Sequence, residues 1–138
     1  MISFTVPGNP VAKGRARATM VAGRARMYTP SKTVSYEGKV ALFASQAMNG
    51  LELLIGPVSL DLVLHMPIPA SWSGKKTKQA IAGEIIPTVK PDCSNVLKAI
   101  EDAMNGIVYK DDSQISDVSI RRCYSASPKV VVYVGVLL

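Results

Sequence analysis

The sequence predicts an α+β fold: one domain in which two main helices pack on a mixed, mostly antiparallel sheet. The chain has 138 residues, of which 48% are hydrophobic, and a chain of this length can bury a core of its own. Two segments carry apolar residues at helical spacing, and four short segments have the patterns typical of strands. Their order along the chain, with no internal repeat, is typical of a single α+β domain over residues 1–138.

The first half of the chain predicts a strand, a basic loop and a helix. Residues 2–6 form a short strand, which the prolines and glycine after it stop. Residues 11–28 show no apolar periodicity and are expected to form a mobile basic loop or ribbon. A helix then starts with Thr29 as its cap and Pro30 in its first position, and Gly50 ends it. Its predicted apolar stripe consists of Val34, Val40, Phe43, Ala44, Ala47 and Met48.

The second half predicts a strand, an excursion, a helix and two closing strands. Residues 58–66 alternate, with apolar side chains at the even-numbered positions, which indicates a half-buried strand. Residues 67–91 form an excursion rich in Pro, Ser and Lys. Residues 94–105 form a second amphipathic helix, which Gly106 closes. The remaining elements are a short helix at 75–82 and closing strands at 115–123 and 130–138, joined across 125–128.

The composition excludes several classes of protein. No apolar run approaches the length of a membrane-spanning helix, so we expect no membrane partner. The first residues lack the features of a secretory signal. The two cysteines, Cys93 and Cys123, give neither a disulfide framework nor a zinc-ligand spacing. We therefore expect a cytoplasmic protein with reduced thiols.

Charge is distributed unevenly along the chain. The net charge is +6, and residues 1–39 alone, with seven bases and one acid, account for this value. Six of the ten acids lie between residues 92 and 117. A basic body suits nucleic acid, because Lys and Arg displace counterions from phosphates. Acids gathered on such a protein are consistent with divalent cations held between carboxylates and phosphate. The alternative is a solvated acidic helix face and an ordinary polar turn.

The residues that could carry chemistry lie between positions 90 and 114. Asp92 stands at the start of the second helix, where backbone N–H groups and the helix dipole favour an anion. Asn95, Lys98 and Asp102 follow at spacings of three and four residues. These spacings place the three side chains on one helix face.

A tight return after this helix could bring Asp111 and Asp112 back beside its polar face. Carboxylates from two places would then converge with Lys98, in an arrangement that can hold Mg²⁺ and neutralise charge on a phosphate. Simpler interpretations exist for each residue: Asp92 as a helix cap, the Asp pair as a turn, and Lys98 with Asp102 as an exposed ion pair.

Eight bases are candidate contacts to DNA phosphates, with a solvated loop as the alternative. They are Lys13, Arg15, Arg17, Arg24 and Arg26 in the basic loop, and Lys75, Lys76 and Lys78 in the excursion. Met27 and Tyr28 are candidate wedges between stacked bases.

Three motifs also resemble a known family. Lys90 to Lys98 (KPDCSNVLK), the following EDAMNG, and YKDDSQ at 109–114 resemble the RusA-type Holliday junction resolvases, small endonucleases of bacteria and their prophages. Residues 10–17 and the run Tyr-Thr-Pro at 28–30 resemble the same family. The resemblance implies a homodimer with a RusA-like α+β fold, encoded by a bacterium or a phage. It also implies binding to four-way DNA junctions and symmetric cutting of two opposing strands, with Mg²⁺ or Mn²⁺ and without a nucleotide cofactor.

The resemblance also assigns roles to single residues. Asp92 and Asp112 correspond to metal-binding catalytic acids, and Lys98 corresponds to the catalytic lysine. Asp111 is a further candidate metal ligand. Weaker candidates are Ser94, Asn95 and Asp102.

The chain departs from the family motif at Ser94, where the family has a second Asp. A hydroxyl adds no charge to offset the desolvation of Mg²⁺. Either another acid such as Asp111 replaces the carboxylate, or the metal binds weakly, or this chain is a naturally or deliberately impaired copy. The leading hypothesis is a metal-dependent junction endonuclease. The alternatives are a junction-binding protein of the same fold that has lost efficient cleavage, and a basic RNA- or protein-binding module with structural acids.

Overall fold

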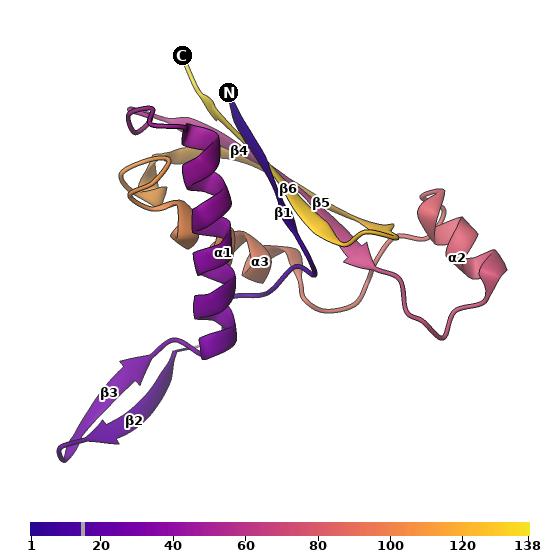
Figure 1. The fold of residues 1–138 in the computed structure, drawn as a ribbon, viewed down its shortest axis with the longest axis horizontal. Helices are drawn as coiled ribbons and strands as arrows, with labels where there is room; N and C mark the ends of the chain where they lie inside the picture. Colours follow the sequence, from indigo (N-terminus) through magenta and orange to yellow (C-terminus); the bar gives the residue numbers. More distant parts are fainter. Residues whose placement is uncertain (15) are drawn as a thin grey trace.

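The computed structural model describes residues 1–14 and 16–138 and confirms the α+β prediction. A mixed four-stranded sheet has the strand order β1-β6-β4-β5, and a separate two-stranded sheet is formed by β2 and β3. Figure 1 shows the large sheet with helices α1 and α3 packed beside it, while β2 and β3 project from the body.

The four main strands are β1 (Ile2–Pro7), β4 (Val58–Pro67), β5 (Ile115–Ser125) and β6 (Lys129–Val136). Side chains alternate between the two faces of each strand, and the face covered by helices is the buried one. The predicted alternation in β4 is confirmed, and its buried face consists of Val58, Leu60, Leu62, Leu64 and Met66. Helices α1 and α3 cover this face and complete the core.

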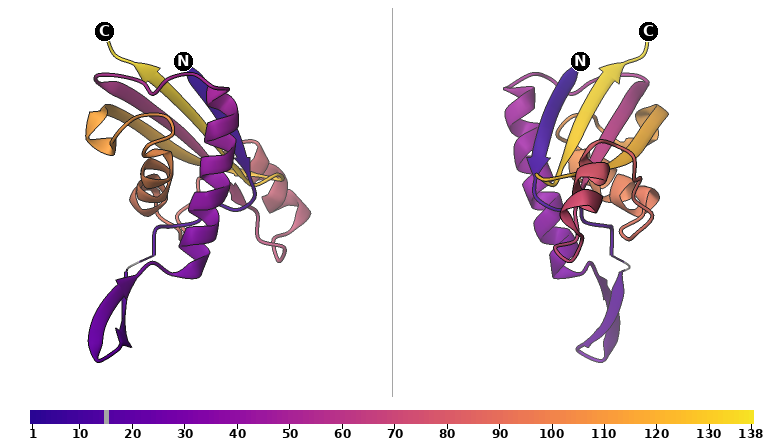
Figure 2. Two further views of the ribbon diagram at one scale, coloured as in Figure 1. Left: turned by 60° about the vertical axis from the view of Figure 1, so that its left-hand side comes forward. Right: turned by 90° about the vertical axis from the view of Figure 1, so that its right-hand side faces the viewer.

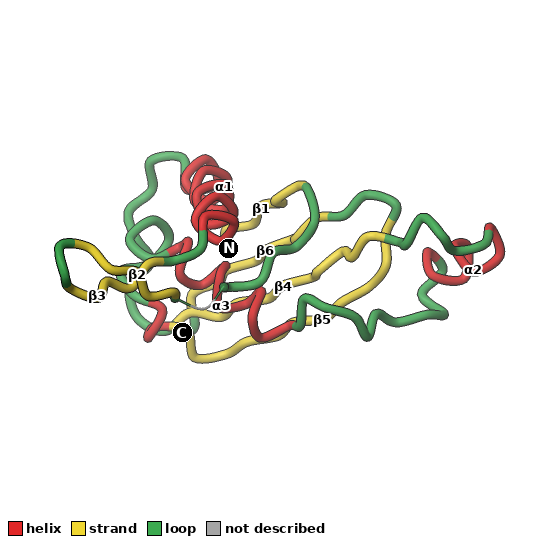
Figure 3. The backbone as a smooth tube through the Cα atoms, turned by 90° about the horizontal axis from the view of Figure 1, so that it is seen from below, coloured by secondary structure: helices red, strands yellow, loops and turns green. Residues whose placement is uncertain are grey.

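Strand β4 lies between the two closing strands. It pairs antiparallel with β6 and parallel with β5, so the sheet is mostly antiparallel with one parallel pair. The turn after Ser125 joins β5 to β6 as predicted, but these two strands are not neighbours. Figure 3 shows β4 between them. Local sequence patterns predict each strand but carry no information about which strand is inserted between two others.

Helix α1 (Ser31–Met48) differs in two details from its prediction. Pro30 occupies the cap position, and the cap hydrogen bond expected from Thr29 is absent from the described residues. Val34 is 54% exposed, whereas Tyr36 is buried. The buried residues of α1 are Thr33, Tyr36, Val40, Ala44 and Met48, and Val34 lies about 100° around the helix from the middle of that row. Neither α1 nor another described helix is long and apolar enough to cross a membrane.

The basic segment contains a two-stranded ribbon, the second of the two forms expected for it. Strands β2 (Arg17–Val21) and β3 (Arg24–Tyr28) pair antiparallel, and every residue of both strands is exposed. Ala22 and Gly23 connect them, both with positive φ (52° and 76°), as in a type I′ turn. Figure 2 shows this hairpin, called the arm below, extending away from the sheet in both views.

The excursion contains one helix, α2 (Gly74–Ile81), one residue earlier than predicted. The side chain of Ser73 caps it by accepting a hydrogen bond from the backbone N–H of Lys76. Trp72 anchors the excursion, because its ring packs edge-on against Tyr124 of β5 with 5.1 Å between centroids. Figures 1 and 3 place α2 and the arm at opposite ends of the molecule.

Candidate active site

Helix α3 (Cys93–Met104) carries the polar face that the sequence predicts. Asp92 is its N-cap, and the Asp92 carboxylate accepts a hydrogen bond from the backbone N–H of Asn95 at 3.3 Å. Lys98 and Asp102 follow Asn95 on the polar face. The buried face consists of Val96, Ala99, Ile100, Ala103 and Met104, and its packing on the sheet fixes the direction in which the polar face points.

The return segment after α3 is folded tightly enough to hold Asp112 in place. A short 3₁₀ turn (Asp112–Gln114) follows Asp111, whose carboxylate accepts from the backbone N–H of Ser113 at 3.0 Å. The side chain of Gln114 accepts from the backbone N–H of Asp111. It also donates to two backbone carbonyls of the loop before β4. These bonds dock the turn against the body of the protein.

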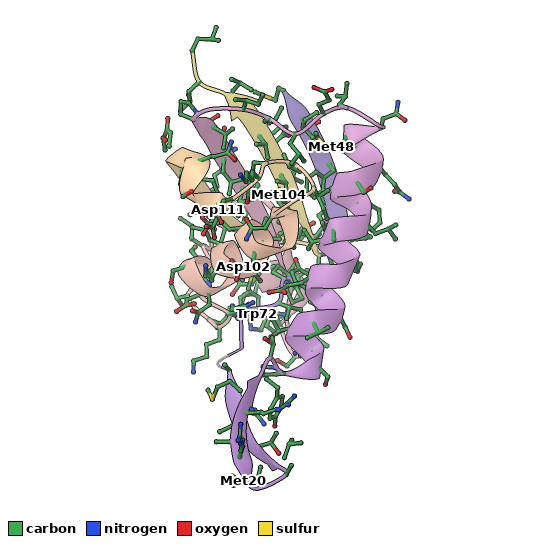
Figure 4. All side chains as sticks on the ribbon, turned by 90° about the vertical axis from the view of Figure 1, so that its left-hand side faces the viewer. Met20, Met48, Trp72, Asp102, Met104 and Asp111 are labelled. Carbon is green, nitrogen blue, oxygen red and sulfur yellow. The ribbon has the colours of Figure 1, made fainter. Side chains whose placement is uncertain are left out.

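Five charged side chains meet beside α3, and we call them the lysine–carboxylate centre. Lys98 Nζ lies 2.9 Å from Asp102 Oδ1 and 3.4 Å from Asp112 Oδ2. Lys13 Nζ lies 3.1 Å from Asp102 Oδ2 and 2.5 Å from Glu37 Oε1. Asp102 thus bonds one lysine with each carboxylate oxygen. Figure 4 shows Asp102 on α3, above the root of the arm, with Asp111 further along the same side of the molecule.

Lys13 and Glu37 enter this centre although the sequence did not predict them there. Lys13 was expected to contact DNA, but it is held between α1 and α3. Its backbone N–H donates to the carbonyl of Asn95 at 2.8 Å, and the next N–H, of Gly14, donates to Thr33 Oγ1 at 2.9 Å. One sequence signal could have found Glu37, because it is the single acid among residues 1–39.

The pKa shifts follow from this pairing. The hydrogen bond to Asp102, with a smaller contribution from Asp112, raises the pKa of Lys98 above its ordinary value despite partial burial. Burial alone would raise the pKa of the Asp102 carboxyl, but the hydrogen bonds from Lys98 and Lys13 outweigh it and lower that pKa. Burial opposes protonation of Lys13, but the bonds to Glu37 and Asp102 raise its pKa. All three groups are therefore charged at neutral pH.

Glu101 and Tyr109 connect helix α3 to the return segment. Burial, together with repulsion from Asp112, raises the pKa of Glu101. The Tyr109 side chain is fully buried, and its hydroxyl donates to the backbone carbonyl of Glu101 at 2.7 Å. This bond ties the return segment, which also carries Asp112, to helix α3.

Arg122 organises the segment that leads into Asp92. Its guanidinium donates to the backbone carbonyls of Pro87, Val89 and Pro91. Arg122 belongs to β5, so the planar fork of one side chain fixes an irregular segment to the sheet at three backbone carbonyls. Asp92 is therefore positioned from both sides, by this segment and by its own helix cap.

A cavity of about 710 Å³ opens beside Asp92. The N-terminal ends of α1 and α3 both border it, and backbone N–H groups at helix N-termini favour anions. Arg17, Lys32 and Lys90 line it together with Asp92 and Asn95. Three bases and two helix N-termini make this cavity a candidate anion-binding site next to the Asp92 carboxylate.

The family model described as Endodeoxyribonuclease RusA matches residues 7–135 of the chain. This chain belongs to the RusA endodeoxyribonuclease family. The match spans the arm, the cavity and the whole lysine–carboxylate centre. A curated relative, the uncharacterized protein YqaN of Bacillus subtilis (strain 168), is 42% identical over 135 residues, covering 96% of this chain and 94% of YqaN. Membership of the RusA family supports endodeoxyribonuclease activity, in agreement with the resemblance seen in the sequence.

In this RusA-family chain, the candidate metal ligands are distributed over two elements. Asp92 is exposed at the cap of α3 and Ser94 is exposed in its first turn, while Asp111 and Asp112 lie on the return segment. Within residues 1–14 and 16–138, no three His, Cys, Asp or Glu side chains are close enough together to form a metal-binding group. Lys98 and Asp112 do meet, whereas the full set of carboxylates does not.

The candidate DNA-binding bases fall into separate groups in the RusA fold. Arg17, Arg24 and Arg26 are exposed on the arm, and Arg15 lies outside the described residues. The three lysines of the excursion, Lys75, Lys76 and Lys78, are exposed on α2. The ammonium of one of them, Lys76, lies 4.1 Å from the centre of the Trp72 ring, which is cation–π geometry. Since α2 and the arm lie at opposite ends, a ligand that contacts both must span the molecule.

Proposed function

We propose that this protein is a divalent-metal-dependent endonuclease that resolves four-way DNA junctions by cutting two opposing strands. The observation that carries the proposal is the meeting of Lys98 with Asp112 beside helix α3, in a member of the RusA endodeoxyribonuclease family. Asp92 lines a basic cavity at the N-terminal end of the same helix. A lysine held by carboxylates, on a helix whose start borders an anion-binding cavity, is suited to stabilising a phosphate under attack.

The donor set fits a divalent cation. Asp92 Oδ1 accepts the cap hydrogen bond and Asp112 Oδ2 pairs with Lys98, so each carboxylate has a second oxygen to offer. Mg²⁺ binds through one or two carboxylates, with waters and substrate phosphates completing its coordination. We assign Asp92 and Asp112 as the ligands and Asp111 as an accessory ligand. Asp102 is left out, because lysines occupy both of its oxygens.

The chain's own residues bind and orient the DNA. Mg²⁺ or Mn²⁺ would supply Lewis-acid chemistry at this site, lowering the pKa of water and polarising a phosphoryl oxygen. Lys98, whose side chain is 53% exposed, can reach a phosphate and neutralise negative charge on it. Arg17, Lys32 and Lys90 guide the DNA backbone into the cavity, and the arginines of the arm hold neighbouring phosphates.

Symmetric cutting of two strands requires two active sites related by a two-fold axis. One chain carries one lysine–carboxylate centre, so the proposed working form is a homodimer, which matches the pseudo-symmetry of a four-way junction. The proposed setting is the cytoplasm of a bacterium, with the protein encoded by the host or by a prophage.

A second candidate function is a junction-binding protein with impaired cleavage. Ser94 favours it, because this exposed hydroxyl stands in the first turn of α3 where a further carboxylate would face the site. The two candidates share the fold, the arm and the cavity. They differ only in the rate of strand cutting with metal present.

The test is to incubate the protein with an end-labelled synthetic four-way junction in EDTA, Mg²⁺ or Mn²⁺. Asp112→Asn, which keeps the size of the side chain and removes its charge, is the matched control. Paired nicks in opposing strands that need metal and are lost in Asp112→Asn support the proposed nuclease. Selective binding to the junction without nicks supports the second candidate. No preference for the junction over linear duplex would refute both.

A further inference from the structure

We propose that Lys13 is a positioning residue for Lys98. By holding one oxygen of Asp102, Lys13 limits the hold of Asp102 on Lys98 and keeps the Lys98 ammonium next to Asp112. The inference deepens the proposed function and rests on it, because Lys98 is the group assigned to the phosphate.

Geometry shows that Lys13 is committed to the protein. Its Nζ lies between a carboxylate of α1, Glu37, and a carboxylate of α3, Asp102, at 2.5 and 3.1 Å. Its side chain is only 25% exposed, against 53% for Lys98. Its backbone N–H is bonded to the carbonyl of Asn95 on the same helix that carries Asp102. The backbone N–H and the side-chain ammonium of Lys13 are therefore both bonded to α3. A lysine that binds DNA phosphates would instead have its ammonium exposed to solvent.

The charges of the centre explain why this matters for Lys98. Three carboxylates, those of Glu37, Asp102 and Asp112, share the ammonium groups of Lys13 and Lys98. Asp102 and Asp112 both attract Lys98, and the shorter distance is already to Asp102. Removing Lys13 would leave Asp102 with Lys98 as its one partner in the centre, free to turn both oxygens toward it. Lys98 would then be drawn away from Asp112 and from the phosphate.

This role makes a different prediction from direct contact with DNA. A lysine on a phosphate contributes to affinity, and its loss lowers the salt dependence of log K by about 0.9 per contact. A positioning residue leaves affinity and salt dependence unchanged and lowers the rate of the chemical step. A binding measurement therefore detects the loss of a phosphate contact, and a cleavage measurement detects the loss of a positioning residue.

The experiment compares Lys13→Met, Lys13→Arg and Lys39→Met. Lys39 is a matched control, because it also tethers α1 to the N-terminal strand, through the carbonyl of Pro7, but lies outside the centre. The affinity for the four-way junction and its salt dependence are measured in EDTA, and the cleavage rate is measured under single-turnover conditions with Mg²⁺. We expect Lys13→Met to slow cleavage on the order of 10- to 100-fold at unchanged affinity, Lys13→Arg to restore most of the rate, and Lys39→Met to match the wild type. If the wild type cuts junctions, an equal cleavage rate for Lys13→Met would overturn the proposal, and so would weaker binding with a smaller salt dependence.

A crystal structure of Lys13→Met gives a second readout that does not require cleavage. We expect Lys98 Nζ to stay bonded to Asp102 and to have left Asp112. If the wild type does not cut junctions but Lys98 has moved in this way, the proposed function fails and the positioning role stands. If Lys98 still bonds Asp112, the positioning role fails whether or not the wild type cuts.

Discussion

Asp92 combines a structural role as the cap of α3 with a proposed role as a metal ligand, and one substitution separates the two. Asn is as good an N-cap as Asp, so Asp92→Asn keeps the bond to the N–H of Asn95 and removes only the charge. We expect its free energy of unfolding to stay within about 1 kcal/mol of the wild type, while metal-dependent cleavage is lost. Urea denaturation and the junction assay measure the two effects. Asp92→Ala is the comparison, because it removes the cap as well and should cost about 1 kcal/mol of stability. Full activity of Asp92→Asn would remove Asp92 from the proposed ligands.

Ser94 is the position where one added charge should help. Because Ser94 is exposed in the first turn of α3, an Asp there faces no steric barrier and is favoured by the helix dipole. We expect Ser94→Asp to raise the cleavage rate at a given Mg²⁺ concentration, and Ser94→Asn, of equal size but neutral, to leave it unchanged. The measurement is the cleavage rate across a Mg²⁺ titration. An unchanged or lower rate in Ser94→Asp would show that the hydroxyl is no defect.

Single residues also show where sequence analysis reaches its limit. Asn95, Lys98 and Asp102 were placed on one helix face by their spacing alone, and the structure has them there. Lys13 was assigned to DNA because it lies in a basic segment, yet its partner Glu37 is 24 residues away. Such a pairing depends on the packing of α1 against α3, which no local spacing records.

At the scale of elements, the arm is the part of the fold with the least packing. Arg17 and Tyr28 are register partners at its base, so residues 18–27 can be replaced by a two-residue Asn-Gly turn. We expect this variant to keep its free energy of unfolding within about 1 kcal/mol, because the removed residues are exposed. We expect its affinity for junction DNA to fall, and the salt dependence of log K to decrease by about 0.9 for each lost arginine contact. Binding titrations at several salt concentrations test this, and undiminished affinity would mean that the arm does not contact DNA.

The segment before Asp92 is held to the sheet by Arg122 of β5. Lys has one ammonium in place of a planar fork, so Arg122→Lys cannot satisfy three carbonyls at once. We expect this variant to lose about 1 to 3 kcal/mol of stability and to cleave more slowly because Asp92 is less well positioned. Thermal denaturation and the cleavage rate test this, with exposed Arg121→Lys on the same strand as the control. Wild-type behaviour of Arg122→Lys would mean that α3 alone positions Asp92.

Most elements were predictable because they carry local patterns, and the exceptions have identifiable causes. The alternation in residues 58–66 and the apolar stripe of α3 each determined an element. The stripe of α1 was assigned through Val34, whereas Tyr36 takes the buried position, because an amphipathic side chain such as Tyr fits either environment. The hairpin of the arm lacks an apolar pattern, since neither of its faces is buried, and only its Gly23 turn hints at it.

At the scale of the whole molecule, the ion pairs of the centre make stability depend on pH. The pKa of Asp102 is lower in the folded protein than its ordinary value near 4. Its pairing therefore stabilises the fold above pH 4 and is lost as the pH falls through the folded-state pKa. We expect the free energy of unfolding to decrease below about pH 4, and Asp102→Asn to show a smaller decrease. Urea titrations between about pH 2.5 and 7, a range that runs from below to above the ordinary pKa of Asp, measure the difference. Parallel pH profiles for both proteins would contradict the assignment.

The overall topology was only partly predictable. The α+β class follows from the order of elements, but the insertion of β4 between β5 and β6 does not, because strand order is settled by how well whole faces pack. Helix α2, within the segment that connects β4 to α3, lies at the opposite end of the molecule from the arm, so its lysines and the arginines of the arm form separate groups.

The order of strands has a consequence for synthesis on the ribosome. Strand β6, the last of the six in the chain, is an inner strand and pairs with both β1 and β4. The nascent chain therefore carries β1, with the apolar Phe4 and Val6, without its partner until residues 129–136 have emerged. The sheet cannot assemble vectorially from its N-terminus, and its pairings join residues distant in sequence, which slows folding. Until residues 129–136 have emerged, the unpaired backbone of β1 is open to pairing with other chains.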